Sequence, residues 1–552
     1  MSNTEKAAFP ALNDEQMARL RGYGAAEMVR DGDVLVSTGQ LTYDFIVLDT
    51  ASAEIVREAD ADQIEAVVAQ APPRRFLGEL NLITGQAVYL TTRTTSDGEI
   101  IRIDPPNFRR LMADETQLSD LILRSFLARR GELQTGEGAR SIRILGSGRS
   151  PESLALRTWA VRSRIAHTWI DIDTDSGRAL AESLDVSPDQ LPVGVTHDGP
   201  ILHATTALLA QAMNLTYAPN AAAGAEAVAD TVVVGAGPAG LAAAVYGASE
   251  GLRTMVFEAV AVGGQASASS RIENYLGFES GISGTELTGR AMIQAQKFGA
   301  TIASPCVVES VHATNGTFEV SLSDSTTMRT RTVVVATGAH FRTLDLPRWH
   351  EFEGRGIFYA ATESEARLCE AGPVAMIGGA NSAGQAALFL AERGSTVTMV
   401  LRSNDLYAGM SAYLAHRIEA DPRIHVRLGS EVTALAGQSN LTGIAVTDHA
   451  TSHTDALDCH ALFCFIGADP ASSWLPGIQL DADGFILTDS ALRLDSAVWA
   501  SLGRNPLPFE TSEPGIFAIG DVRAWSMKRV AAAAGDGASC VRSIHQFLGL
   551  TS

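Results

Sequence analysis

The most regular hydrophobic pattern in the chain begins with an unbroken apolar run at residues 231–234, which leads into a glycine-rich turn and an alanine-rich stretch. An apolar run without polar alternation is typical of a strand buried on both faces, and the alanine-rich stretch predicts a helix packed on it. A second apolar run follows at residues 253–257. The pattern therefore predicts a strand-turn-helix-strand unit with parallel strands.

The turn in this unit has the spacing Gly-x-Gly-x-x-Gly, at Gly235, Gly237 and Gly240. The first glycine allows a tight turn, the second leaves room for a pyrophosphate, and the third lets helix and strand pack closely. The helix N-terminus offers free N–H groups to phosphates. Because Glu258 ends the second strand, where a carboxylate accepts hydrogen bonds from ribose hydroxyls, the unit predicts a dinucleotide site rather than a plain βαβ turn.

A second pattern of the same kind occupies residues 373–402. Counted from the first glycine of each motif, Leu401 stands where Glu258 stands in the first unit, and Arg402 follows it. Without an acid to hold a 2′-hydroxyl and repel a 2′-phosphate, the motif favours NADPH over NADH. The alternative for Arg402 is a solvated surface arginine. The fingerprint positions hold Gly378, Ala380 and Ala383, and the methyl group of Ala380 is expected to crowd the pyrophosphate.

Shorter patterns fill the part of the chain before the first motif. Between about residues 29 and 103, short β-rich pieces are separated by Gly, Asp, Thr and Pro, which predicts a small antiparallel barrel. Helical stretches at 13–23 and 106–130 flank it. Strand and helix patterns then alternate between residues 142 and 215, which predicts a small α/β unit.

Length and composition argue against several classes of function. A chain of 552 residues is too long for one core, and no apolar run is long enough to cross a bilayer. A net charge of −21 argues against a nucleic-acid surface. The N-terminal residues lack the basic and apolar segments of a signal peptide, so we expect a cytoplasmic protein. Neither a Cys-x-x-Cys nor metal-ligand spacing occurs among Cys306, Cys369, Cys459, Cys464 and Cys540, so we expect no metal.

From residue 230 onward, the order of motifs resembles that of thioredoxin reductases. After the first unit come a Gly-Gly-Gln segment, a Glu-Asn-aromatic-Gly segment, a strand ending in Ala-Thr-Gly and, late in the chain, a Gly-Asp pair before a helix. The resemblance implies FAD and NADPH as cofactors and a homodimer. For FAD it implies Gly235, Gly237, Pro238, Ala239, Gly240, Glu258, Gly263, Gly264, Gln265, Asn274, Val307, Ala336, Thr337, Gly338, Gly520, Asp521, Arg529, Val530 and Ala531. For NADPH it implies Gly378, Gly379, Ala380, Asn381, Ser382, Ala383 and Arg402.

The chain departs from this family at the redox pair. In thioredoxin reductases a Cys-x-x-Cys lies just before the NADPH motif, and here Ala360 and Glu363 stand at the two cysteine positions. Cys369 follows as a lone thiol, either structural or a single-thiol catalyst. We expect an FAD-dependent oxidoreductase that passes electrons from NADPH to an unidentified external acceptor, a redox protein or a small molecule. A weakly catalytic or non-catalytic regulator acting through the N-terminal domains, and a thioredoxin-disulfide reductase using Cys369, remain open.

Two N-terminal segments also carry resemblances. Residues 76–86 resemble the phosphate-binding cassette of cyclic-nucleotide-binding domains, with Gly78 and Glu79 at its Gly-Glu pair, but no arginine follows before Arg93. A docking or dimerisation role is therefore favoured over a cyclic-nucleotide sensor. The next unit resembles thioredoxin, with Pro192 at the position of the family's cis-proline, but it has no cysteine at residues 146–153. Without a thiol it cannot relay electrons, so packing or binding is left to it.

The predicted architecture is multidomain, with a β-barrel, an α/β thioredoxin-like unit, and two Rossmann-like three-layer nucleotide-binding domains. The predicted bounds are 1–133 for the cyclic-nucleotide-binding-like domain, 141–217 for the thioredoxin-like domain, 230–347 and 461–552 for the two parts of the FAD domain, and 348–460 for the NADPH domain.

Overall fold

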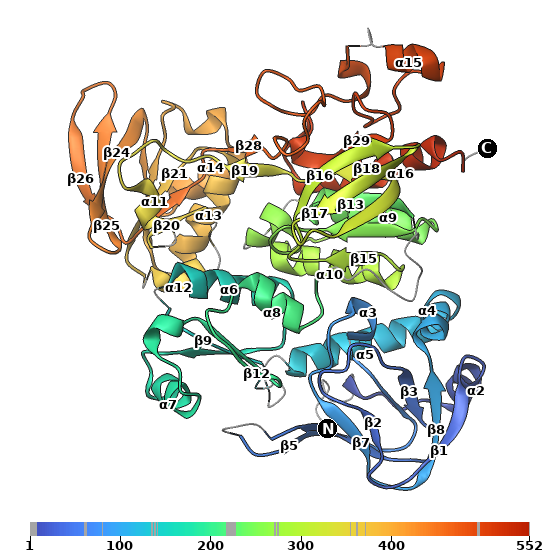
Figure 1. Ribbon diagram of the computed structural model, residues 1–552. Helices are drawn as coiled ribbons and strands as arrows, with labels where there is room; N and C mark the ends of the chain where they lie inside the picture. Colours follow the sequence, from blue (N-terminus) through green and yellow to red (C-terminus); the bar gives the residue numbers. More distant parts are fainter. Residues whose placement is uncertain are drawn as a thin grey trace.

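The computed structural model describes residues 8–59, 63–79, 81–133, 136, 140, 142–148, 150–216, 228–269, 272, 275–353, 355–359, 361, 363–369, 371–493 and 497–550. Figure 1 shows the chain as four lobes, with the N-terminal elements and the thioredoxin-like elements on one side of the two C-terminal sheet domains. The colour change from blue to red shows that the last elements of the chain return to the lobe that begins with β13.

The N-terminal lobe contains two four-stranded antiparallel sheets, ordered β1-β8-β3-β6 and β2-β7-β4-β5. The first sheet packs on two helices through a group of buried phenylalanines, with the Phe45 and Phe108 ring centroids 4.9 Å apart. The strands are β1 (Ala25–Val29), β2 (Val34–Val36), β3 (Phe45–Leu48), β4 (Ala53–Arg57), β5 (Ala66–Ala71), β6 (Arg75–Leu77), β7 (Thr91–Thr94) and β8 (Gly98–Ile103). The helices are α2 (Asp14–Arg21), α3 (Asn81–Thr84), α4 (Pro105–Asp114) and α5 (Thr116–Leu133).

The second lobe is a mixed sheet ordered β10-β9-β11-β12, in which only the β9–β10 pair is parallel. The Leu191–Pro192 peptide bond is cis, as predicted. The fully buried Trp159 lies in the core between the sheet and its helices. The elements are β9 (Arg143–Gly146), α6 (Pro151–Arg162), β10 (Thr168–Asp171), α7 (Asp175–Ser183), β11 (Val193–Thr196), β12 (Gly199–Ile201) and α8 (Thr206–Ala212).

The third lobe contains a sheet ordered β15-β14-β13-β18-β17-β16, with β29 added beside β18. The apolar run predicted as a buried strand is the central β13, which pairs in parallel with β14 and β18. Its strands are β13 (Ala229–Val234), β14 (Thr254–Phe257), β15 (Thr301–Ala303), β16 (Val308–Thr314), β17 (Thr317–Leu322), β18 (Thr327–Val335) and β29 (Ile516–Ala518). Its main helices are α9 (Pro238–Ser249), α10 (Gly284–Lys297) and α16 (Val530–Phe547).

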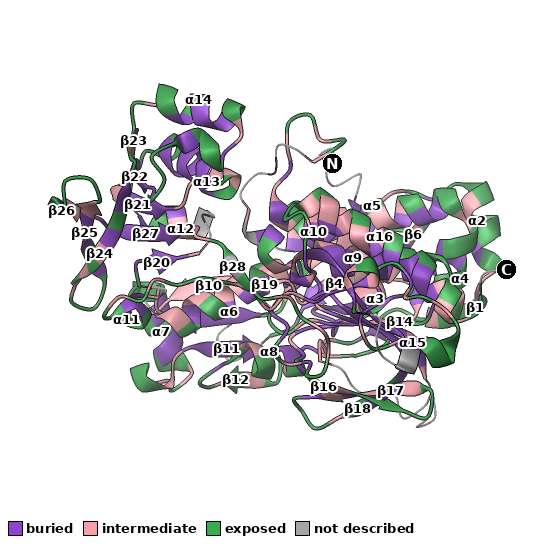
Figure 2. Ribbon diagram, turned by 90° about the horizontal axis from the view of Figure 1, so that it is seen from above, coloured by how far each residue is buried: buried purple, intermediate pink, exposed green. Residues whose placement is uncertain are grey.

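The alanine-rich α9 is buried on most sides because other elements cover it. A Cβ added to Gly537 of α16 would lie 2.2 Å from the carbonyl oxygen of Ala239, so the two helices are in backbone contact. Figure 2 shows this region as largely buried, beneath more exposed outer helices. A helix that is apolar all round is stable only when it is covered in this way.

The fourth lobe has a parallel sheet ordered β20-β27-β21-β22-β23, and a three-stranded antiparallel sheet β24-β25-β26. The predicted boundary between residues 460 and 461 is wrong, because β27 (Ala461–Cys464) pairs with β21 and β20 of this sheet. The other elements are α11 (Trp349–Phe352), β20 (Ile357–Phe358), α12 (Glu363–Leu368), β21 (Pro373–Ile377), α13 (Asn381–Glu392), β22 (Thr396–Val400), α14 (Ala412–Ala420), β23 (Ile424–Arg427), β24 (Ser430–Gly437), β25 (Leu441–Asp448) and β26 (Thr454–Asp458).

Two short antiparallel strands, β19 (Ala339–Phe341) and β28 (Ala468–Pro470), connect the third and fourth lobes. The chain leaves the third lobe through β19 and returns through β28, so both crossings lie side by side. A further short helix, α15 (Ala497–Leu502), precedes β29. Within the described ranges, no helix is long and apolar enough to span a bilayer.

Candidate functional site

A cavity of about 290 Å³ lies where the first glycine-rich turn, the late Gly-Asp segment and the fourth lobe meet. Elements from both crossings contribute to it. Residues that we predicted for FAD and that line it are Gly235, Gly237, Pro238, Ala239, Glu258, Gly264, Gln265, Ala336, Thr337, Gly338, Asp521, Arg529 and Val530. Ser382, which we predicted for NADPH, lines the same cavity.

The three glycines of the first motif differ in their backbone surroundings. Gly235 has φ +104°, and an added Cβ would lie 2.4 Å from the carbonyl oxygen of Ala336. An added Cβ on Gly240 would lie 1.9 Å from the carbonyl oxygen of Gly235, so only glycine permits this contact between turn and helix. Gly237 differs, because its nearest neighbour would be the Cα of Gly264 at 3.9 Å. The open side of Gly237 borders the cavity, where a pyrophosphate fits.

Glu258 follows β14 and lines the cavity beside the turn. Its carboxylate accepts hydrogen bonds from the backbone N–H groups of Ala236 at 2.7 Å and Val260 at 3.0 Å. Burial raises the pKa of Glu258, and these N–H donors oppose the shift. A carboxylate has about four acceptor positions, so Glu258 keeps acceptor capacity for ribose hydroxyls.

The late Gly-Asp segment brings a second acid and a lysine to the cavity. The described residues donate no hydrogen bond to the Asp521 carboxylate, whose pKa is raised by burial. Lys528 donates from Nζ to the carbonyl oxygen of Asp521, and burial lowers its pKa. The following helix, α16, begins after Arg529 without a side-chain cap, so its N-terminal N–H groups face the cavity unpaired by a cap. The Asp521 carboxylate and the free N–H groups of α16 fit a flavin, whose side chain carries hydroxyl groups.

Several predicted FAD residues do not line the cavity. Gly263 and Gly520 have positive φ and permit close contacts, since an added Cβ on Gly520 would lie 2.8 Å from the Cβ of Ala239. Gly240 packs against the turn, and Ala531 is exposed at the start of α16. Val307 is exposed between β15 and β16. Asn274 lies outside the described residues.

The second glycine-rich turn has the same backbone design as the first. Gly378 has φ +133°, and an added Cβ would lie 2.3 Å from the carbonyl oxygen of Phe465. Ala380 is the N-cap of α13 and provides no side-chain cap, which leaves the helix N-terminus free for phosphate. Asn381 accepts a hydrogen bond from the N–H of Ser411 at 2.7 Å, while Ala383 is fully buried.

Arg402 is exposed at the end of β22, next to the buried Leu401. An added Cβ on Gly379 would lie 2.7 Å from the Leu401 side chain, so this side chain packs against the glycine-rich turn. Leucine thus occupies the position at which the first motif has Glu258. Among the described residues, Arg402 has no hydrogen-bond or ion-pair partner. The guanidinium is therefore available to a 2′-phosphate.

The structure adds cavity residues that the sequence analysis did not select. Phe341 of β19 and Tyr359 after β20 stack with ring centroids 5.3 Å apart, and both line the cavity with Phe465. Gln385 of α13 also lines it. Phe341 lies three residues after the Ala-Thr-Gly segment, and Phe465 lies just after the predicted boundary at residue 461, which was the one sequence signal for them. The cavity thus has an aromatic side that the glycine motifs do not reveal.

All five cysteines are buried. Cys369, which has no exposed surface, donates from Sγ to the carbonyl oxygen of Glu365 at 3.1 Å. Burial, with a smaller effect from Glu365, raises the pKa of the Cys369 thiol to about 12. No cysteine lines the cavity among the described residues. Ala360 lies outside the described residues, and Glu363 is the first residue of α12.

The second lobe contacts both the third and the fourth lobes next to this cavity. Its core includes Ala261, three residues after Glu258, and Leu154 of α6 packs on the core of the fourth lobe. Burial lowers the pKa of Arg162 at the end of α6, while Glu365 of α12 and Glu258 favour its charge. Figure 1 shows α6 beside α12. The second lobe therefore packs on both lobes that form the cavity.

Two strand-turn-helix-strand units lining one cavity define a class, the flavin- and pyridine-nucleotide-dependent oxidoreductases with two dinucleotide-binding domains. The family model described as "Pyridine nucleotide-disulphide oxidoreductase" matches residues 229–537. The chain belongs to this family.

Individual relatives agree with the family. The chain is 34% identical over 325 residues to a thioredoxin reductase of Treponema pallidum, a match that covers 58% of this chain and 97% of the relative. A thioredoxin reductase of Streptomyces clavuligerus is 33% identical over 323 residues, covering 58% and 94% of the two chains. The crystal structure of T. acidophilum thioredoxin reductase is 28% identical, with a TM-score of 0.52, and the match covers 58% of this chain and 99% of that chain.

The family confirms the prediction of an FAD-dependent pyridine-nucleotide oxidoreductase, and FAD and NADPH are the cofactors of the thioredoxin reductase group. The two-domain fold of thioredoxin reductases accounts for the C-terminal part of the chain. The family model begins at residue 229, so the two N-terminal lobes lie before the matched region. Their assignment to cyclic-nucleotide-binding-like and thioredoxin-like families stays a prediction.

Proposed function

We propose that the chain passes electrons from NADPH through FAD to an external acceptor without an internal dithiol. The observation that supports this most directly is a cavity lined by residues of both nucleotide-binding units and, among the described residues, by no cysteine. When bound, FAD supplies a group that accepts two electrons from a nicotinamide and gives them to a second substrate. The acceptor is a small molecule or a redox protein, and by resemblance to thioredoxin reductases the enzyme is a homodimer.

The residues of this chain bind and orient the cofactors in this proposal. The turn at Gly237 and the N-terminus of α9 hold the pyrophosphate, and Glu258 and Asp521 accept hydrogen bonds from hydroxyl groups. The uncapped N-terminus of α16 favours negative charge on the nearby edge of the flavin. Ser382 and Gln385 of α13 bring the NADPH-binding helix to the same cavity.

Cys369 is expected to take no part in the reaction. With a pKa of about 12, roughly one Cys369 in ten thousand is a thiolate at pH 8, and the thiolate is the nucleophile. We predict that iodoacetamide does not label Cys369 in the folded protein at pH 8 and that labelling rises as the pH approaches 12. Mass spectrometry of folded and denatured protein measures this, with full labelling of the denatured chain as the control.

An activity assay of a Cys369 variant tests the same prediction. Cys369→Ser keeps a donor for the Glu365 carbonyl, so we expect unchanged rates of NADPH-dependent flavin reduction and of reduction of an artificial one-electron acceptor. We also expect wild type to reduce thioredoxin no faster than this variant. Rapid turnover of thioredoxin by wild type that Cys369→Ser abolishes would overturn the proposal and make Cys369 the nucleophile.

We predict that NADPH reduces the flavin with a higher kcat/KM than NADH, and that Arg402→Ala removes most of this preference. One lost charge-assisted contact to the 2′-phosphate costs about 1.5–3 kcal/mol. Stopped-flow reduction with both nucleotides measures the ratio, and Arg417→Ala, at another exposed arginine of the same lobe, is the control. Equal kcat/KM values of wild type for the two nucleotides contradict the assignment.

A second candidate function is a weakly catalytic or non-catalytic regulator that acts through the N-terminal lobes. The packing of the second lobe on both nucleotide-binding lobes favours it, because this packing connects the second lobe to both lobes that form the cavity. Rapid bleaching of the flavin by NADPH, followed by acceptor-dependent reoxidation, distinguishes the enzyme from the regulator. A flavin that NADPH bleaches but that no acceptor reoxidises favours the regulator.

A further inference from the structure

The N-terminal lobe contains a second cavity, of about 260 Å³, bounded by strands of both its sheets and by α5. Hydrophobic side chains make up most of its wall, including Val36, Ile55, Leu77, Val88 and Leu90. Protein interiors leave few voids larger than a water molecule, whereas small-molecule sites are concave and mostly apolar with a few polar groups. The composition of this wall is that of a ligand site.

Three charged side chains line the cavity, and two of them are carboxylates, Glu79 and Glu132. The third, Arg129, is buried and donates to the carbonyl oxygens of Ala8 at 2.7 Å and Phe76 at 2.8 Å, and also to that of Gly78. Its guanidinium also stacks on aromatic rings, 4.7 Å from the Phe76 centroid. Arg129 is therefore held by the protein, and the lining carries a net negative charge.

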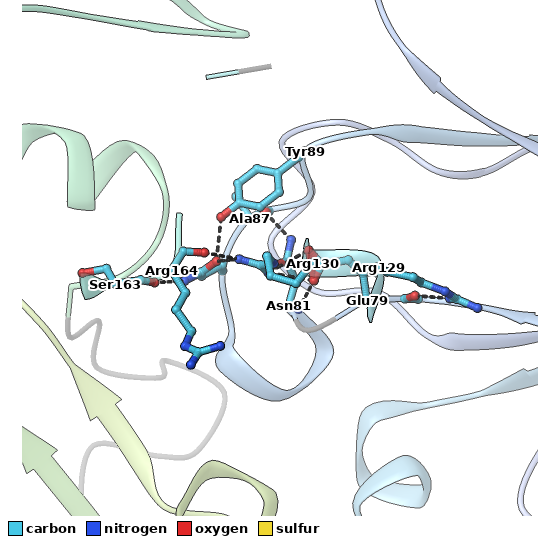
Figure 3. A network of polar contacts seen from close by, with 10 residues as sticks. Glu79, Asn81, Ala87, Tyr89, Arg129, Arg130, Ser163 and Arg164 are labelled. Atoms are coloured by element: carbon cyan, nitrogen blue, oxygen red, sulfur yellow. Dashed lines mark hydrogen bonds and ion pairs between the residues drawn. The ribbon is translucent and has the colours of Figure 1, made fainter. Parts of the chain in front are cut away.

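The neighbouring guanidinium of Arg130 is also held by the protein, through both of its terminal nitrogens. Its Nη2 donates to Glu79 Oε2 at 2.7 Å and to the Asn81 side chain, and its Nη1 donates to the carbonyl oxygen of Arg164 at 2.7 Å. Figure 3 shows Arg130 between the Glu79–Asn81 segment and the carbonyl groups of the thioredoxin-like lobe. Arg93, at the place where an arginine first follows the cassette, pairs with Glu54 and Glu65 at 2.7 Å each. An anionic ligand would find no free arginine at the described part of this wall.

A hydroxyl group of the wall is available to a ligand. Thr92 is buried in β7 and lines the cavity, and no described residue makes a hydrogen bond to its hydroxyl. A buried hydroxyl is satisfied by a partner with a polar atom. We propose that this cavity binds an uncharged, largely apolar small molecule with one hydrogen-bonding group, and not a phosphate-bearing nucleotide.

The wall of this cavity continues into the contact with the FAD domain. Asn81 lines the cavity and is the first residue of α3, and Ile83 of α3 packs on the core that contains α9 and α10. An added Cβ on Gly284 at the start of α10 would lie 1.7 Å from the carbonyl oxygen of Ala266, which lines the flavin cavity. A ligand that orders Asn81 is therefore expected to protect the amides of α3 and α10 from hydrogen exchange.

The test uses the full-length holoprotein and the neutral fluorescent probe N-phenyl-1-naphthylamine. We expect saturable binding at one site per chain that cyclic AMP does not displace, with slower exchange in α3 and α10 on addition of the probe. Ala69→Trp and Val88→Trp fill the cavity and should each weaken binding at least about tenfold, so one variant serves if the other fails to fold. Met28→Trp, at an exposed position of β1, is the matched control and should bind like wild type.

Three results overturn the proposal. These are absence of saturable binding by wild type, unchanged binding by a folded cavity-filling variant, and displacement of the probe by cyclic AMP. The last result would show that the site accepts an anionic nucleotide in spite of its committed arginines.

Discussion

Gly237→Val is expected to yield a folded protein that has lost its FAD. Gly237 has φ −74° and ψ −176°, which valine adopts freely, and the nearest atom to an added Cβ is 3.9 Å away. The branched side chain therefore fits the protein and projects into the cavity where the pyrophosphate binds. Overpacking of this kind costs about 1–3 kcal/mol, which corresponds to about 10–100-fold weaker FAD binding.

The measurement is the ratio of flavin absorbance to protein after purification, together with circular dichroism. Gly131→Val is the matched control, because Gly131 is an exposed residue of α5 with no atom within 4 Å of an added Cβ. The control should keep the FAD content of wild type. Stoichiometric FAD in Gly237→Val would show that the pyrophosphate binds elsewhere.

Arg130→Met is expected to destabilise the N-terminal lobe by about 3–5 kcal/mol, the usual cost of leaving one partner of a buried ion pair alone. The Arg130 side chain is 2% exposed and that of Glu79 is 15% exposed, so the remaining carboxylate would be largely cut off from water. The substitution also removes the bond from Arg130 to the Arg164 carbonyl, which joins the first two lobes. Differential scanning calorimetry should show the lowest unfolding transition moving to lower temperature.

Two further variants separate charge from packing. Arg124→Met changes the same residue type on the same helix, but Arg124 and its partner Asp120 are 72% and 56% exposed, so a loss of about 0–1 kcal/mol is expected. Adding Glu79→Gln to Arg130→Met removes the stranded charge and should restore part of the lost stability. If Arg130→Met melts like Arg124→Met, the ion pair contributes no stability.

The sequence by itself determined both glycine motifs, their flanking strands and helices, and the presence of an acid, Glu258, at the end of the first motif only. These are local features, since a turn that needs φ above zero at Gly235 or close backbone contact at Gly240 restricts the residue type within a few positions. The same locality explains why the missing Cys-x-x-Cys was visible without a structure. The preference for NADPH likewise rests on two adjacent residues, Leu401 and Arg402.

Only the tertiary structure decided which distant groups meet. Arg130 pairs with Glu79 although the two residues are 51 positions apart in the chain. The cassette sequence, which has no arginine close by, therefore gave no sign that a guanidinium pairs with its glutamate. The strand β27 joins the fourth lobe because its hydrogen-bonding partners lie in β21 and β20, which an apolar run alone does not specify. Burial, which raises the pKa of Cys369, likewise depends on packing between elements far apart in the chain.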